Sequence, residues 1–274
     1  MTNRRLAAAG LTFVMAIALL MAFPSVRAAA GEILSLFRVQ KFAPISVSAE
    51  QMALLNQLEE QNLSPGEFVN VNDPGEPVRV SSLEEAAAQT GYQLRTMLGR
   101  DLSSDLQVRN EASGTLIIDL VGSRALLEAA GVDPMLLPDS LEGGRVDVRV
   151  YPFVRQSYSD GVVLMQTAAP NVSYPEGVDL TVIGEAALRL LGSDPDTARR
   201  MAQSIDWTST LLLPIPQEMG TYSEVSVDGV MGVALEPFSL EASPAVVWQR
   251  DGMVYTITGP LTTESLIDLA NSLN

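Results

Sequence analysis

The sequence predicts a mixed α+β fold built on an antiparallel sheet, and two observations support this class. Asp-Gly pairs separate runs of alternating apolar and polar residues at three places, Asp160-Gly161, Asp228-Gly229 and Asp251-Gly252. Asp-Gly favours two-residue hairpin turns, because both central residues of such a turn need positive φ. Helical patterns are few and stand between strand patterns, which is typical of α+β proteins rather than of alternating βαβ units.

Two capping boxes start helices in the first half of the chain. Ser48 to Gln51 and Ser82 to Glu85 each place a serine three residues before a Gln or Glu, so that the serine can accept from a free helical N–H. Gly91 should end the second helix in the left-handed conformation. A third, short helix is expected over Ser123–Ala130, ending at Gly131. Strands are expected over Ala43–Val47, Phe68–Val71, Tyr92–Met97 and Thr115–Val121.

The second half begins with a long alternating run, Arg145 to Tyr158, which the turn at Asp160-Gly161 joins to a strand over Val162–Thr167. Asp194 is placed to cap a helix with Pro195 at its first position, where the missing N–H of proline leaves no bond unmade. The expected helices are Gly184–Leu191 and Pro195–Ser204, and the expected strands are Thr208–Pro214, Glu224–Val227 and Val230–Leu235.

A β-hairpin and a helix end the chain. Pairing across Asp251-Gly252 sets Trp248 opposite Tyr255 and Val246 opposite Ile257, which makes one face of the hairpin apolar and aromatic. The helix that follows has its expected cap and its apolar face at Thr262, Leu266, Leu269, Ala270 and Leu273.

The N-terminus predicts export. Arg4 and Arg5 precede an uncharged apolar run, Leu6 to Phe23, whose length of about 18 residues is close to the minimum for a bilayer span. Ala28 to Ala30 also satisfies the small-x-small rule for signal cleavage. Two interpretations therefore remain, an uncleaved transmembrane anchor and a cleaved signal peptide, and the apolar length favours the anchor.

Both interpretations place the bulk of the chain outside the cytoplasm. We therefore expect a cytoplasmic tip with an anchor or signal segment over 1–27 and one extracytoplasmic α+β domain over 28–274, at a bacterial cell membrane or exported if the signal is cleaved. The first thirty residues hold three of the 17 basic residues and none of the 33 acidic ones, which leaves the remainder a net charge of −19. Such a surface disfavours nucleic acid.

The absence of histidine and cysteine limits the chemistry of this chain. It removes the commonest general base, the common catalytic triads and nearly all zinc sites. We therefore expect no enzymatic activity, no metal site and no cofactor. A pair of carboxylates could still hydrolyse a cell-envelope polymer, which is kept as a remote alternative. Glu84, Glu85, Asp194 and Asp251, however, all stand where they serve a helix start or a turn.

Four segments resemble a known exported domain. They are Ser82–Leu94, Ile205–Pro216, Val227–Val233 and Val247–Leu273. The last contains W-x-x-D-G-x-x-Y and a helix ending in A-N-S-L. The segments resemble the C-terminal extracytoplasmic domain, of unassigned biochemical function, of membrane-anchored anti-sigma-factor-like bacterial proteins. That domain is similar in architecture to periplasmic lipoprotein carriers and sigma regulators. The resemblance implies a curved antiparallel half-barrel with a few helices on its concave side, an apolar cavity for acyl chains and one preceding N-terminal apolar helix.

The resemblance also implies a function in binding. Because only Met1 to Arg5 precede the apolar run, we expect no cytoplasmic sigma-binding domain. The expected function is that of a membrane-anchored sensory or regulatory domain for a lipid or acyl ligand, or for a membrane-protein or anti-sigma partner. A periplasmic lipid or lipoprotein carrier is the alternative. Candidate ligand-binding residues are Trp207, Trp248, Met253 and Tyr255, for each of which ordinary core packing is the competing interpretation.

Overall fold

The computed structural model describes residues 41–61 and 63–274. The expected apolar helix at Leu6 to Phe23 lies outside the described residues. Within them the fold is α+β with mostly antiparallel sheets, six α-helices and no closed barrel, so the predicted class is confirmed. None of the helices in this described part has the length and apolar character needed to cross a bilayer.

The strands are β1 (Lys41–Val47), β2 (Gly66–Asn72), β3 (Val78–Arg79), β4 (Leu102–Arg109), β5 (Ala112–Ile118), β6 (Arg145–Val150), β7 (Phe153–Tyr158), β8 (Val163–Ala168), β9 (Asn171–Ser173), β10 (Thr210–Pro216), β11 (Gly220–Val227), β12 (Val230–Pro237), β13 (Ala245–Arg250) and β14 (Met253–Thr258). The α-helices are α2 (Ala49–Glu60), α3 (Leu83–Thr90), α4 (Leu120–Ala129), α5 (Leu180–Leu190), α6 (Pro195–Ser204) and α7 (Thr263–Asn271). Two short 3₁₀ turns follow α4, η1 (Pro134–Leu136) and η2 (Asp139–Leu141).

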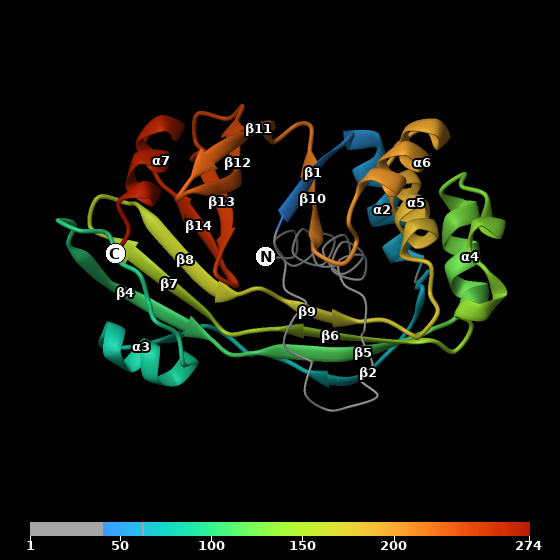
Figure 1. Ribbon diagram of the computed structural model, residues 1–274, viewed down its shortest axis with the longest axis horizontal. Helices are drawn as coiled ribbons and strands as arrows, with labels where there is room; N and C mark the ends of the chain where they lie inside the picture. The colour runs from blue at the N-terminus through green and yellow to red at the C-terminus, as the bar shows by residue number, and fades with distance from the viewer. Residues whose placement is uncertain (1–40, 62) are drawn as a thin grey trace.

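Three long bent strands join the two larger sheets. The eight-stranded sheet has the order β11-β12-β13-β14-β8-β7-β4-β3, and the four-stranded sheet has the order β2-β5-β6-β9. Only two residues separate β4 from β5, β6 from β7 and β8 from β9, so each pair is one chain path that bends between sheets. Pro152 and Pro170 stand at two of these bends, where a residue without an N–H interrupts the ladder. Figure 1 shows these strands running across the lower part of the molecule.

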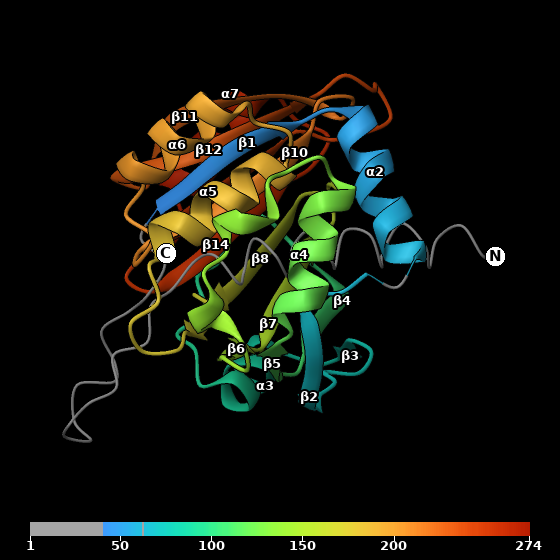
Figure 2. The same ribbon diagram turned by 90° about the vertical axis from the view of Figure 1, so that its right-hand side faces the viewer.

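The helices distribute unequally around these strands. Figures 1 and 2 both place α4, α5 and α6 on one side of the long strands and α3 on the opposite side. The strands β1 and β10 form a separate two-stranded parallel sheet on the same side as α5 and α6. Two large clusters of buried hydrophobic residues form the core. One contains residues of α2, α4, α5 and α6, and the other contains residues of the terminal hairpin and α7.

Most predicted turns and caps are confirmed. Asp251 and Gly252 both have positive φ (52° and 79°), and the register pairs Trp248 with Tyr255. The Thr262 hydroxyl accepts from the N–H of Ser265 at the start of α7. The other predicted caps are also present, at Ser48, Ser82 and Asp194, and Gly91 ends α3 with φ 74°.

The predicted strand Tyr92–Met97 is wrong. This segment crosses the face of the eight-stranded sheet instead of joining its edge, and side chains replace its ladder partners. The backbone N–H of Arg95 donates to Oε1 of Gln166, and its carbonyl accepts from both Gln166 and Gln156. Both glutamine side chains are fully buried, so their amides form hydrogen bonds with protein groups such as this segment and not with solvent. Alternation alone cannot distinguish such a segment from a strand.

Other boundaries differ for local reasons. The predicted run Arg145 to Tyr158 is two strands, because the chain bends at Tyr151 and Pro152. Helix α4 begins at Leu120, three residues before the predicted start, since Asp119 accepts from the N–H of Val121 and caps it. Strand β4 had no sequence prediction. The parallel pairing of β1 with β10 was not predicted either, because it joins segments about 170 residues apart, beyond the reach of local patterns.

Candidate functional site

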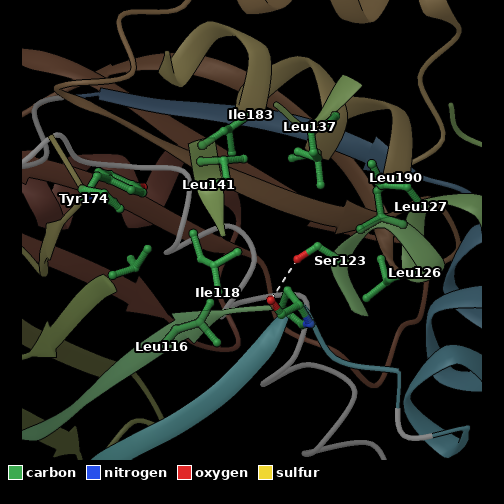
Figure 3. A pocket seen from close by; sticks show the side chains of 15 residues that line it. Leu116, Ile118, Ser123, Leu126, Leu127, Leu137, Leu141, Tyr174, Ile183 and Leu190 are labelled. Carbon is green, nitrogen blue, oxygen red and sulfur yellow. Dashed lines mark hydrogen bonds between the residues drawn. The ribbon is translucent and has the colours of Figure 1, made fainter. Parts of the chain in front are cut away.

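An apolar cavity of about 110 Å³ lies between the four-stranded sheet and the helices α4 and α5. Its lining comes from β5 and β6, from α4 and α5, from the chain around η1 and η2, and from loop residues before β2 and after β9. Figure 3 shows these side chains pointing toward a common space. The lining residues are Pro65, Leu116, Ile118, Ser123, Leu126, Leu127, Leu137, Leu141, Val146, Tyr174, Pro175, Ile183, Ala186, Ala187 and Leu190.

Helix α5 explains why space remains there. Ile183, Ala186, Ala187 and Leu190 recur at helical spacing, so they share one face that is directed at the sheet. Two of these four positions are alanines, which bury little volume between large neighbours. Elsewhere along α5 packing is tight: a methyl group at Gly184 would lie 2.1 Å from Cζ2 of Trp207. The void therefore results from the small side chains and not from loose packing of the whole helix.

The cavity has few polar groups. The hydroxyl of Ser123 donates to the carbonyl of Pro65 (2.8 Å), the bond drawn as a dashed line in Figure 3. Arg124, the next residue on α4, donates to the carbonyl of Leu137 and to Asp139. No ionisable group other than the Tyr174 phenol is present among the lining residues described, so the cavity offers no acid–base pair. Such a site can bind an apolar group but cannot catalyse proton transfer between side chains.

The cavity volume suits a small apolar group. An engineered apolar cavity of about 150 Å³ in another protein stays dry and binds benzene or xenon. The cavity of about 110 Å³ has a similar volume and an apolar lining, but it is partly open to the surface. Water gains little there, because a buried water needs two to four polar partners. An aromatic ring or the end of a branched alkyl chain would regain the dispersion contacts that the void lacks.

The structure places the four sequence-predicted site residues in two separate clusters. Trp207 is buried against α5 and donates from Nε1 to the carbonyl of Ala202 (2.7 Å). Trp248 and Tyr255 stack in the other cluster with ring centroids 5.2 Å apart, and Met253 packs against the same cluster. None of the four is among the residues that line the apolar cavity, although Gly184, under Trp207, neighbours the lining residue Ile183.

An ion cluster around the buried carboxylate of Asp228 holds the second group together. The carboxylate of Asp228 accepts from Arg95, from Arg250 (2.5 Å) and from Nε1 of Trp248 (3.2 Å). Arg95 also donates to the carbonyl of Leu273 (2.8 Å), which links the segment Tyr92–Met97 to the residues just after α7. Burial alone would raise the pKa of Asp228, but the hydrogen bonds and charges of Arg95 and Arg250 outweigh it and lower the pKa. The cluster is satisfied internally, which points to a structural role.

Local sequence patterns contain little sign of the cavity. The pair Ala186-Ala187 on the apolar face of α5 is the one local signal that could have indicated missing volume, but small residues also mark close helix packing.

Within the described residues, no group of three acidic side chains is arranged to hold a metal ion. No protein-family model, curated protein sequence or solved structure matches this chain.

Proposed function

We propose that this protein is a membrane-anchored extracytoplasmic binding domain that takes up an apolar ligand and breaks no bonds. The observation that carries the proposal is the cavity between α4, α5 and the four-stranded sheet, with its almost purely hydrocarbon lining. Apolar clefts with few polar groups are typical of ligand sites. The acyl or aryl end of a lipid is the ligand class that this lining favours.

The remaining parts of the proposal rest on the sequence. The apolar run at Leu6 to Phe23 supports the anchor, and the resemblance to anti-sigma-factor-associated domains supports a sensory or regulatory role with a membrane-protein partner. A half-barrel of the lipoprotein-carrier type, with helices on its concave side, belongs to the same proposal. The strands that bend between the two sheets support this curvature.

The test is ligand uptake by purified residues 31–274. Mass spectrometry of solvent extracts should find retained lipid, and a fluorescent fatty acid should bind saturably. Ala187→Leu places a larger side chain in the cavity lining and should weaken uptake at least about tenfold, a loss of about 1.4 kcal/mol. Ala53→Leu makes the same substitution at an exposed position of α2 and should leave uptake unchanged.

Two results would contradict the proposal. One is the absence of both retained lipid and saturable uptake, which would leave protein contact as the activity. The other is uptake that Ala187→Leu does not alter, which would place the ligand elsewhere.

A periplasmic lipid or lipoprotein carrier is the second candidate, favoured by the same cavity and by the cleavage pattern at Ala28 to Ala30. A carrier must leave the membrane, whereas a sensor keeps its anchor. N-terminal sequencing of the mature protein separates the two, because a carrier would begin near Gly31 and a sensor would retain Leu6 to Phe23.

A further inference from the structure

The four-stranded sheet has two different faces. On one face Leu116, Val146 and Val172 are buried in the core beside the cavity. The opposite face carries two rows of polar residues, set by the register of β5, β6 and β9. The rows are Ser113, Arg149 and Asn171, and Thr115, Asp147 and Ser173.

This polar face is hollowed. A depression of about 550 Å³ is lined by both rows and by residues at their ends. A β-bulge in β2 sets Asn70 at positive φ (52°) and brings it into the lining. Glu111 and Tyr151, which stand at the bends between the two sheets, also line the depression. The bends and the bulge thus give the surface a shape that a flat polar sheet face lacks.

Several of these groups are held in place within the protein. Thr115 is buried, and its hydroxyl donates to Asp147 (2.5 Å). Arg149 forms an ion pair with Glu111 (2.8 Å), and its guanidinium lies 5.2 Å from the centroid of the Tyr151 ring. A site whose side chains are already fixed on strands loses little entropy when a ligand binds.

Other polar groups of the depression are left over. In the described part of the chain, the side chains of Ser113, Asn171 and Ser173 are half-buried and have no hydrogen-bond partner in the protein. Their polar atoms are open to solvent in the depression, where a ligand can reach them. Together they offer hydroxyl groups that both donate and accept, and an amide that does both through different atoms.

The balance of charge selects the ligand class. Glu111 neutralises Arg149, so the charge that remains is the one carboxylate of Asp147. This disfavours phosphates and other anions, while the absence of a third acidic ligand among the described residues disfavours a metal ion. Hydroxyls, an amide, a carboxylate and a tyrosine ring suit a ring with several hydroxyl groups and an apolar C–H face. We propose that this depression binds a neutral saccharide, independently of the apolar cavity.

The test is saturation-transfer NMR on the full chain in a zwitterionic detergent without a sugar head group. The probes are cellobiose, maltose and diacetylchitobiose. At least one should show saturable transfer to its ring protons. Asn171→Ala, and Asn171→Asp, which keeps the shape and removes the N–H donors, should each weaken binding about tenfold, the effect of about 1.4 kcal/mol. Ser173→Ala should also weaken it, whereas Ser223→Ala, on exposed β11, should not.

The inference is overturned if none of the three disaccharides gives saturable transfer. It is also overturned if both Asn171 variants bind as the wild type does. Ala187→Leu should leave saccharide binding unchanged, because the cavity lies on the other face of the sheet. Loss of saccharide binding in that variant would assign the sugar to the cavity and contradict a separate site.

Discussion

Two regions of this protein, one around the terminal hairpin and α7 and the other around α4 and α5, are packed in different ways. Around the terminal hairpin and α7 the core is closed by large side chains and by the ion cluster that Arg95 and Arg250 form with the buried Asp228. Around α4 and α5 the core is mainly leucine and alanine, with Trp207 packed on one part of α5, and it contains a cavity of about 110 Å³. In the first region, Arg95, Asp228 and Arg250 come from three different chain segments, and the hydrogen bonds among them join these segments. In the second region, the hydroxyl of Ser123 donates to the carbonyl of Pro65, and the rest of the lining is almost entirely apolar.

This difference separates stability from binding. A charge network around a buried carboxylate tolerates little displacement, because leaving that carboxylate unpaired carries a desolvation cost. Apolar contacts are non-directional, so side chains around a void can shift to admit a ligand. We therefore expect the terminal hairpin region to stabilise the fold, and we expect the side chains of the α4–α5 region to shift when a ligand binds.

The largest expected effect is at Trp248. Its side chain is fully buried, stacks on Tyr255 and donates to Asp228. Trp248→Ala should lower the free energy of unfolding by about 3 to 5 kcal/mol, the usual cost of removing a buried aromatic side chain. Urea unfolding followed by circular dichroism measures the change. A midpoint equal to that of the wild type would contradict the assigned structural role of this region.

Asp228 should make part of the stability depend on pH. Its folded-state pKa is lowered, so the stabilisation is fully present above the unfolded pKa of about 3.9 and is lost as the pH falls through the folded value. Asp228→Asn removes the counter-charge of Arg95 and Arg250, whose side chains are 21% and 44% exposed, so it should cost about 1.5 to 3 kcal/mol at pH 7, the usual range for hydrogen bonds to a charged group. The gap between wild type and variant should then narrow below about pH 4.

The control for this experiment is Asp196→Asn. The Asp196 side chain is 80% exposed on α6 and forms a long ion pair with Arg199 (3.9 Å). Its loss should change the stability by less than about 0.5 kcal/mol. A wild-type to Asp228→Asn gap that stays constant from pH 7 to pH 3 would show that the carboxylate charge is not what stabilises the cluster.

The parts of the fold that depend on residues close together in the sequence are predictable from it. The turn at Asp251-Gly252 and the cap at Thr262 follow from local conformational preferences, and both are present. The segment Tyr92–Met97 was mistaken because its hydrogen-bond partners, Gln156 and Gln166, come from strands about 60 and 70 residues away. Patterns within a short window carry no record of such pairing.

The site was harder to predict than the fold. The large contact area of aromatic residues makes Trp248 and Tyr255 candidates from sequence; in the structure they stack on each other, and a role of either in ligand binding stays a prediction. The cavity instead depends on what is missing at Ala186 and Ala187. Missing volume can be recognised only when all the surrounding elements are in place. It is a property of the assembled fold and not of any one segment.

The smallest effect gives the most direct comparison of the two regions. Ala270 of α7 and Ala187 of α5 are both buried helical alanines, with 0% and 2% exposure. Ala270→Leu adds volume where no space is free and should cost about 1 to 3 kcal/mol. Ala187→Leu adds it beside the cavity and should change the stability little, or raise it by about 0.5 to 2 kcal/mol as cavity-filling substitutions do. Urea midpoints of both variants decide the matter: equal losses would mean that the α4–α5 region is as tightly packed as the terminal hairpin region.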